Sequence, residues 1–170
     1  MKDYVKLYLN QDKKANEELE KNVKKLQEDG TYPKILEMPL TIQYELTTNC
    51  NLKCKHCYNQ SGLNHNNDKM KGKEWIDLTK YIISKGGIFQ SIISGGEPLL
   101  MGDDLITIMD LLHNDGTGFV LITNGWLLNQ KWIEKFKKYD FYWLQVSIDG
   151  FDKKYHDRFR GVEGSWDRAI

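Results

Sequence analysis

The cysteines are the residues whose type and spacing most suggest chemistry. All three, Cys50, Cys54 and Cys57, lie within eight residues, separated by three and then by two other residues. An odd number of cysteines grouped so tightly excludes a disulfide framework, which needs pairs of cysteines spread along a chain. Clustered thiols in a reducing compartment are typical of a metal or redox centre. The segment 50–57, which we call the cysteine loop, is therefore the first candidate site.

Three kinds of centre fit this spacing. A cluster of four irons normally takes four thiolates, so three cysteines would leave one iron open, and an open metal position can admit a substrate. A zinc site would need a fourth ligand such as His56 or His65, although zinc motifs more often consist of two well-separated cysteine pairs. A pair of redox-active thiols would use Cys54 and Cys57 alone and would leave Cys50 without a role.

The elements around the cysteine loop are predicted by the hydrophobic pattern. Residues 40–46 alternate apolar and polar side chains, which predicts a strand that leads towards Cys50. Further strands are expected at 88–94, 118–122 and 142–148, and helices at 73–85, at 103–113 and after Asn129. This alternation is typical of parallel βαβ construction, so the fold class is α/β. Open α/β sheets and barrels place their sites just after the strands, where these polar and glycine motifs fall.

Three further motifs follow the later strands: Ser94-Gly95-Gly96-Glu97-Pro98, Thr123-Asn124-Gly125 and Ser147-Ile148-Asp149-Gly150. Gly95 and Gly96 let the backbone approach a ligand closely, and their carbonyls can accept hydrogen bonds from an ammonium group. Glu97 adds a negative charge for the same group. Each motif also has a simpler interpretation, because Gly-Gly-Glu-Pro fits a plain turn and the polar side chains can bond to neighbouring backbone.

Taken together, these motifs resemble the signature of the radical S-adenosylmethionine (radical SAM) enzymes. The cysteine loop is similar to the family's C-x3-C-x-aromatic-C motif, with His56 in the aromatic position as a flat ring beside the cluster. The segment 94–98 matches the family's GGEP motif, and the segments 123–125 and 147–150 resemble its motifs after the third and fourth strands. The four matches occur in the family's order and span about residues 40–168.

The resemblance implies a [4Fe-4S] cluster on Cys50, Cys54 and Cys57, with S-adenosylmethionine chelated at the open iron. It implies reductive cleavage of S-adenosylmethionine to a 5′-deoxyadenosyl radical that abstracts hydrogen from a substrate. Arg160 would pair with the cofactor carboxylate, with Arg158 as the alternative, in a segment expected to be a loop. The expected cofactor-binding residues are Ser94, Gly95, Gly96, Glu97, Thr123, Asn124, Ser147, Asp149 and Arg160. Two alternatives stay open: a zinc-stabilised interaction module without catalysis, and a relative that binds S-adenosylmethionine without cleaving it.

The resemblance also implies an architecture and partners. The fold would be a partial TIM-like barrel, apparently truncated after about four βα units, with residues 39–170 as the core. Residues 1–38 would form a mainly helical extension, because 11–29 carries apolar side chains at helical spacing and Gly30 follows as a stop. Relatives with this motif set and such an extension often modify ribosomally made peptides, and other relatives act on tetrapyrroles, on small cofactors or in enzyme activation. A peptide is therefore one candidate substrate, and the sequence does not identify which of these classes applies. A ferredoxin or flavodoxin would act as the reductant.

Composition limits the other classes of function. The 24 Lys and Arg residues are balanced by 24 Asp and Glu residues, which argues against general nucleic-acid binding. The sequence has no run of 18 apolar residues and no secretory signal, so a cytoplasmic protein without membrane contact is expected. The remaining histidines, His113 and His156 among them, are expected at the surface or in loops. The tryptophans Trp126, Trp132, Trp143 and Trp166 are expected to serve in packing.

Overall fold

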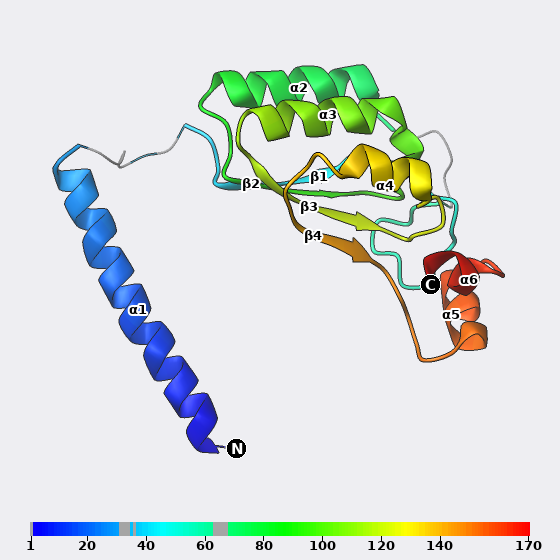
Figure 1. Cartoon of the computed structure of the whole chain (residues 1–170), viewed down its shortest axis with the longest axis horizontal. Helices are drawn as coiled ribbons and strands as arrows, with labels where there is room; N and C mark the ends of the chain where they lie inside the picture. The colour runs from blue at the N-terminus through cyan, green and yellow to red at the C-terminus, as the bar shows by residue number, and fades with distance from the viewer. Residues whose placement is uncertain (1, 31–34, 36, 63–67) are drawn as a thin grey trace. The chain divides into compact units, whose positions relative to one another are not determined.

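The computed structural model describes residues 2–30, 35, 37–62 and 68–170 (Figure 1). The chain divides into two compact units, Met1–Glu37 and Met38–Ile170. The first unit contains one helix, α1 (Lys2–Glu28), which begins nine residues earlier than the pattern predicted. Gly30 follows α1 with a positive φ of 80°, a conformation that glycine adopts without steric cost.

The second unit is built on a parallel sheet of four strands in sequence order (Figure 1). The strands are β1 (Thr41–Glu45), β2 (Gln90–Ser94), β3 (Gly118–Thr123) and β4 (Phe141–Val146), and each pairs in parallel with the next. Helices α2 (Gly72–Ser84), α3 (Asp103–Asn114) and α4 (Gln130–Phe136) link them and cover one face of the sheet, and a short 3₁₀ turn, η1 (Pro98–Met101), precedes α3. The α/β class predicted from the sequence is confirmed.

The hydrophobic core lies between the sheet and these helices. Tyr44, Ile93 and Phe119 point into it from three strands, and Leu105 and Met109 meet them from α3. Because successive strand residues face opposite sides, the other face of the sheet carries a different set of side chains. Among the described residues, no helix combines the length and the apolar character that crossing a bilayer requires.

Trp143 corrects one prediction, since its side chain is 57% exposed instead of packed. Its neighbour Leu144 packs against the core, so the alternation of β4 turns Trp143 to the face of the sheet without helices. The sequence could not show this, because the pattern identified the strand without saying which side the helices cover.

The segment after β4 corrects a second prediction. It forms two helices, α5 (Lys153–Arg160) and α6 (Ser165–Ala169), whereas the segment around Arg160 was expected to be a loop. Asp152 begins α5 by accepting a hydrogen bond from the backbone N–H of Tyr155, and Gly161 ends it with a φ of 73°. These two helices lie beyond the end of the sheet, beside the cysteine loop (Figure 1).

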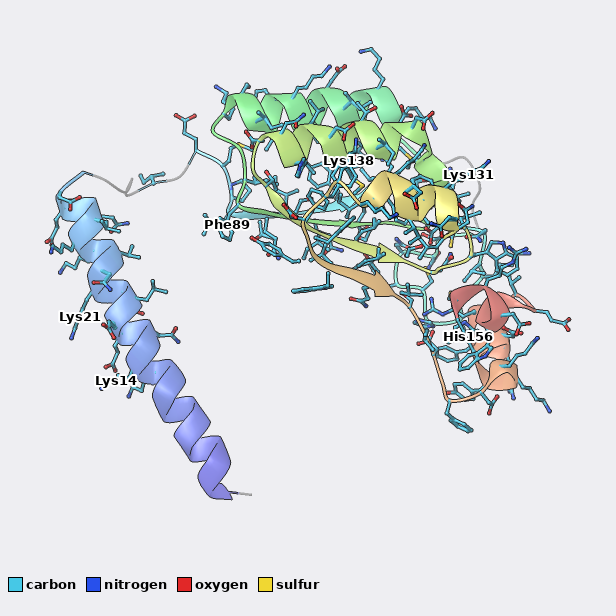
Figure 2. The ribbon with its side chains drawn as sticks, in the orientation of Figure 1. Lys14, Lys21, Phe89, Lys131, Lys138 and His156 are labelled. Carbon is cyan, nitrogen blue, oxygen red and sulfur yellow. The ribbon has the colours of Figure 1, made fainter. Side chains whose placement is uncertain are left out.

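His156, on α5, is fully buried, which overturns its expected place at the surface (Figure 2). Its Nδ1 accepts a hydrogen bond from the backbone N–H of Asp149 at 3.1 Å, and its ring packs edge-on against Trp166. His156 therefore joins α5 to α6 and to the loop after β4. Figure 2 shows Phe89 at the opposite end of the sheet, where the strands begin.

Candidate functional site

The segment just before the cysteine loop and the loop after β2 are joined through their backbones. The N–H of Gly96 donates to the carbonyl of Thr47 at 2.6 Å, and the N–H of Glu97 donates to that of Asn49 at 2.9 Å. This contact explains why glycine is needed at position 96, because a Cβ there would stand 2.1 Å from the carbonyl oxygen of Asn49. The Gly-Gly motif thus fixes the chain immediately before Cys50.

Helix α5 is joined to the cysteine loop in a similar way. The backbone N–H groups of Lys53 and Lys55 donate to the carbonyls of Arg160 and Phe159, at 3.0 and 3.1 Å. Carbonyls in the last turn of a helix lack partners within the helix, so the cysteine loop supplies the donors that they need. The same contact brings Arg160 beside the cysteines.

These loops enclose a cavity of about 150 Å³ at the carboxyl ends of the strands, which we call the cysteine cavity. It is lined by Cys50, Leu52, Cys54, His56, Cys57, Tyr58, Ser61, Gly96, Ile122, Thr123, Asn124, Ser147 and Arg160. The structure therefore brings together all three cysteines and five of the expected cofactor-binding residues. The other four, Ser94, Gly95, Glu97 and Asp149, do not line the cavity.

Each cysteine sulfur accepts at least one N–H hydrogen bond. The donors are Leu52 N at 3.4 Å and Asn124 Nδ2 at 3.7 Å for Cys50, Arg160 Nη1 at 3.7 Å for Cys54, and Ser61 N at 3.3 Å for Cys57. Donors of this kind stabilise a thiolate ligand and tune the metal that it holds. Ser61 was not foreseen as a site residue, because no motif links it to Cys57.

Burial makes the free thiolates costly. It raises the pKa of the Cys50 thiol to about 11 and raises the pKa of the Cys54 thiol, which the nearby Arg160 partly opposes. A partly buried thiolate needs a cation to offset its desolvation, and metal ions provide one. These cysteines are therefore expected to stay protonated without a metal and to lose their protons when a metal binds.

The residues considered as ligands of a zinc site have different places. No group of three or more His, Cys, Asp or Glu side chains within the described residues could hold one metal ion. A zinc ion needs all its ligands at about 2.0–2.3 Å from one point, whereas a cluster gives each thiolate an iron of its own. His65, one of the two histidines considered as a zinc ligand, lies outside the described residues. The other, His56, stacks on Phe159 with ring centroids 4.6 Å apart.

Glu97 has a structural place that its motif did not reveal. Its carboxylate is fully buried and accepts hydrogen bonds from Thr123 Oγ1 at 2.7 Å, Asn124 N at 2.8 Å and Leu99 N at 3.1 Å. Burial raises the pKa of Glu97, although these hydrogen bonds oppose the shift. Glu97 thus joins the loops after β2 and β3, and its contact with a bound ammonium group stays a prediction.

Arg160 and Arg158 lie in different places. The side chain of Arg160 is 10% exposed, and its Nε lies 2.7 Å from Oδ2 of Asp149. Asp149 also lies 3.6 Å from Nε2 of His56. Arg158 instead lines a separate surface hollow with Lys55, whereas Arg160 lines the cysteine cavity. Of the two, Arg160 is therefore placed to meet a ligand of that cavity.

Asp68 is a second residue that the motifs did not identify. Its carboxylate accepts hydrogen bonds from Thr47 Oγ1 at 2.5 Å, from the N–H and Oγ1 of Thr48 at 2.6 Å, and from Asn49 Nδ2 at 3.0 Å. Burial alone would raise the pKa of Asp68, but the hydrogen bonds from Thr47 and Thr48 outweigh it and lower the pKa. Asp68 therefore anchors the three residues that precede Cys50.

Comparisons with known proteins agree with this geometry. The model of the radical SAM superfamily matches residues 44–170. The AdoMet-dependent heme synthase of Methanosarcina barkeri is 36% identical over 135 residues, which are 78% of this chain and 37% of that protein. The antilisterial bacteriocin subtilosin biosynthesis protein AlbA of Bacillus subtilis is 31% identical over 133 residues, which are 76% of this chain and 28% of AlbA.

The fold is also found in solved structures. The crystal structure of Streptococcus suis SuiB bound to S-adenosylmethionine aligns with 89% of this chain and 33% of SuiB, with a TM-score of 0.63 and 22% identity. The sheet and its helices are accordingly part of the TIM-like barrel that the motifs predicted. The chain spans about a third of the length of the relatives that it matches.

Proposed function

Since the chain belongs to the radical SAM superfamily, we propose that Cys50, Cys54 and Cys57 hold a [4Fe-4S] cluster beside which S-adenosylmethionine binds and is reductively cleaved. One observation carries this proposal: the three sulfurs line one cavity, and each accepts an N–H hydrogen bond there. Three thiolates leave one iron of such a cluster without a protein ligand.

The residues around the cysteines have separate tasks in this proposal. When bound and reduced, the cluster would supply one electron for the reductive cleavage of S-adenosylmethionine. Gly96 offers a backbone carbonyl to the ammonium group of the cofactor, and the Arg160 guanidinium offers N–H donors to its carboxylate. Ser147 and Asn124 offer polar groups to the ribose. Leu52 and Ile122 form an apolar part of the cavity wall that excludes water.

Asp149 would hold Arg160 ready for this contact. Its carboxylate forms an ion pair with the guanidinium at Nε, while Nη1 of the same guanidinium donates to Cys54. Because a guanidinium is planar, fixing one nitrogen fixes the direction of the others. The remaining N–H groups of Arg160 are then oriented before the cofactor arrives, which lowers the entropy cost of binding it.

We propose a ribosomally made peptide as the substrate of the whole protein. This assignment is supported by relatives such as AlbA and the mycofactocin maturase MftC of Mycolicibacterium smegmatis, which is 30% identical over 137 residues. SuiB has also been solved with its precursor peptide SuiA. A metallated tetrapyrrole is the second candidate, because the heme synthase of Methanosarcina barkeri shares 36% of its residues with this chain over the matched region.

Anaerobic reconstitution with iron and sulfide tests the cofactor assignment. We expect about four irons per chain by metal analysis, and 5′-deoxyadenosine after addition of S-adenosylmethionine and dithionite. Cys50→Ala, Cys54→Ala and Cys57→Ala should each abolish 5′-deoxyadenosine formation. Ser84→Ala on α2 serves as a control that should retain it. Stoichiometric zinc without iron in the folded chain would contradict the proposal, as would binding of S-adenosylmethionine without cleavage.

The substrate classes are separated by binding. The reconstituted chain is titrated with an iron porphyrin, followed by its Soret absorbance, and separately with a panel of ribosomally made precursor peptides that includes SuiA. Binding of a peptide alone supports a peptide maturase. A Soret shift at stoichiometric porphyrin, without peptide binding, would favour the tetrapyrrole.

A further inference from the structure

Asn59 lies two residues after Cys57, and its side-chain amide contacts the sulfur of that cysteine. Oδ1 of Asn59 accepts the S–H of Cys57, with the oxygen and sulfur 2.9 Å apart. The same oxygen accepts hydrogen bonds from the N–H and the Oγ of Ser61, at 3.1 and 2.6 Å. The N–H of Ser61 also donates to Cys57 Sγ at 3.3 Å. Asn59, Ser61 and the Cys57 sulfur therefore form one hydrogen-bonded group.

The amide nitrogen of Asn59 is in the opposite situation. Nδ2 is shielded from solvent and has no hydrogen-bond partner within the described residues. Buried donors are nearly always paired, because an unpaired N–H loses its bond to water and gains none in return. The amide thus receives three donors on its oxygen and has no acceptor for its two N–H groups. A buried donor left unpaired beside a candidate metal ligand indicates a contact that forms when the metal is bound.

The turn that carries Asn59 is held in place by its backbone. Gln60 has a φ of 55°, and no other described residue apart from glycine has a positive φ. Its N–H donates to the carbonyl of Cys57 at 3.2 Å, and the N–H of Gly62 donates to the carbonyl of Thr48 at 3.2 Å. A strained φ of this kind persists where the surrounding structure enforces it, and such strain is concentrated at functional sites. The side-chain amide of Asn59 is therefore kept beside Cys57.

Iron at Cys57 would change the hydrogen bonds that its sulfur can make. A sulfur bound to iron carries no hydrogen, so it accepts hydrogen bonds and donates none. It would then face Oδ1 of Asn59, and two acceptors would meet at 2.9 Å. Half a turn of the amide exchanges Oδ1 and Nδ2 without changing the space that the side chain fills. The two N–H groups then point at Cys57 Sγ and Ser61 Oγ, which can both accept, while the N–H of Ser61 keeps its bond to Cys57.

We propose that Asn59 donates a hydrogen bond from Nδ2 to the iron-bound sulfur of Cys57 and thereby raises the reduction potential of the cluster. This inference rests on the proposed function, which places iron on Cys57. One-electron reduction adds a negative charge to the cluster, so an N–H donor at a ligand sulfur stabilises the reduced form more than the oxidised form. Because Asn59 acts through Cys57, it is a positioning residue and takes no part in the reaction itself.

Alanine substitution tests this role in the reconstituted chain. Asn59→Ala removes both side-chain N–H groups from the neighbourhood of Cys57. Asn129→Ala is the matched control, because it removes an amide that accepts a hydrogen bond from Trp132 N at the start of α4 and does not line the cysteine cavity. Both variants lose local hydrogen bonds, so a general loss of stability would affect them alike.

The first readout is the midpoint potential, obtained from the EPR signal of the reduced cluster in a redox titration. We expect Asn59→Ala to lower the equilibrium constant of one-electron reduction about tenfold, which equals a fall of about 59 mV in potential. Asn129→Ala should keep the potential of the parent. An unchanged potential in Asn59→Ala would overturn the proposal, as would an equal fall in the two variants.

Asn59→Asp keeps the test decisive if Asn59→Ala takes up too little iron to titrate. Aspartate has nearly the shape of asparagine, and its oxygens can accept the hydrogen bonds from the N–H and Oγ of Ser61. It offers no N–H to Cys57 and adds a negative charge, and both changes disfavour the reduced cluster. We expect the equilibrium constant of reduction to fall by more than tenfold. A potential equal to that of the parent would overturn the proposal.

The second readout detects the hydrogen bond itself. After exchange into heavy water, pulsed ENDOR spectra of the reduced cluster report the deuterons that are bonded to its sulfur ligands. Asn59→Ala should lose one exchangeable coupling that the parent and Asn129→Ala both keep. The same couplings in all three proteins would overturn the proposal. A parent chain that takes up no iron–sulfur cluster would instead contradict the proposed function, and this inference with it.

Discussion

The Asp149 carboxylate and the Arg160 guanidinium form an ion pair at the edge of the cysteine cavity, with Oδ2 and Nε 2.7 Å apart. The pair joins the loop after β4 to the last residue of α5, and Arg160 extends from it to Cys54. Side-chain exposures of 10% for Arg160 and 27% for Asp149 leave the pair mostly shielded from water. Removing one partner therefore strands a largely buried charge.

We expect Asp149→Asn to lower the free energy of unfolding by about 2 kcal/mol, below the value for a fully buried pair because Asp149 keeps contact with water. Urea denaturation measures this change. The Nε–H of Arg160 should also exchange faster with solvent in NMR spectra of arginine-labelled protein. Asp103→Asn, which removes the exposed partner of Lys135, is the control and should change stability little. Equal effects of the two variants would contradict the expected role of the pair.

Asp68 anchors the approach to Cys50, so Asp68→Asn should affect both stability and iron uptake. An amide offers one acceptor oxygen in place of two, which leaves donors among Thr47, Thr48 and Asn49 unsatisfied. We expect a loss of about 1–2 kcal/mol in the free energy of unfolding at pH 7. Iron content after reconstitution should fall as well. Asp77→Asn on α2 is the control, and a normal iron content in Asp68→Asn would show that the anchor is dispensable.

The fold could be predicted from the sequence because its signals are local. Period-two alternation and apolar runs located the strands, and the glycine motifs located the loops that follow them. Helix α5 was missed although Asp152 and Gly161 supply a start and a stop signal, because most of the eight residues between them are charged. Trp143 was misplaced because its exposure depends on which face of the sheet the helices cover.

Residues of the cysteine cavity could be predicted only where they belong to a recognisable motif. Cys50, Asn124 and Arg160 lie in recognisable segments, and the structure brings them together. Ser61 and Asp68 act through hydrogen bonds that form when the chain folds back on itself, and no spacing in the sequence predicts such contacts. Glu97 shows the same limit, since its motif was visible but its bonds to the β3 loop were not.

Glu97 should make stability depend on pH above the ordinary range of a carboxyl group. Burial raises its pKa in the folded chain, so its contribution is fully present below the ordinary value of 4.5 and is lost as pH rises through the folded pKa. In Glu97→Gln this loss cannot occur. The free energy of unfolding of the parent, minus that of the variant, should therefore fall as pH rises from about 4.5 to 8, by about 1.4 kcal/mol for each pH unit of pKa shift.

Denaturation in urea at a series of pH values measures that difference. The exposed residue Glu163 provides a control, since Glu163→Gln should differ from the parent by a constant amount over the same range. Carboxylates whose pKa is lowered by folding, such as Asp68, lose their stabilising contribution as pH falls instead of as it rises. All three proteins contain these carboxylates, so their contributions cancel in the difference between parent and variant. A flat difference for Glu97→Gln would show that the folded chain does not favour the protonated carboxyl.

Gly96 should tolerate no side chain, for reasons of space alone. Its φ is not in the left-handed region, but a Cβ would meet the carbonyl oxygen of Asn49 at 2.1 Å and its carbon at 2.7 Å. Because the obstacle is backbone, it cannot move aside as a flexible side chain would. We expect Gly96→Ala to cost about 3 kcal/mol of unfolding free energy and to reduce iron uptake, since Asn49 precedes Cys50.

In contrast, Gly116→Ala meets open space at a φ of 81° and should cost about 1 kcal/mol from backbone strain while leaving iron uptake unchanged. Equal losses in the two variants, with equal iron contents, would show that the contact between the Gly-Gly motif and the segment before the cysteine loop does not constrain the site.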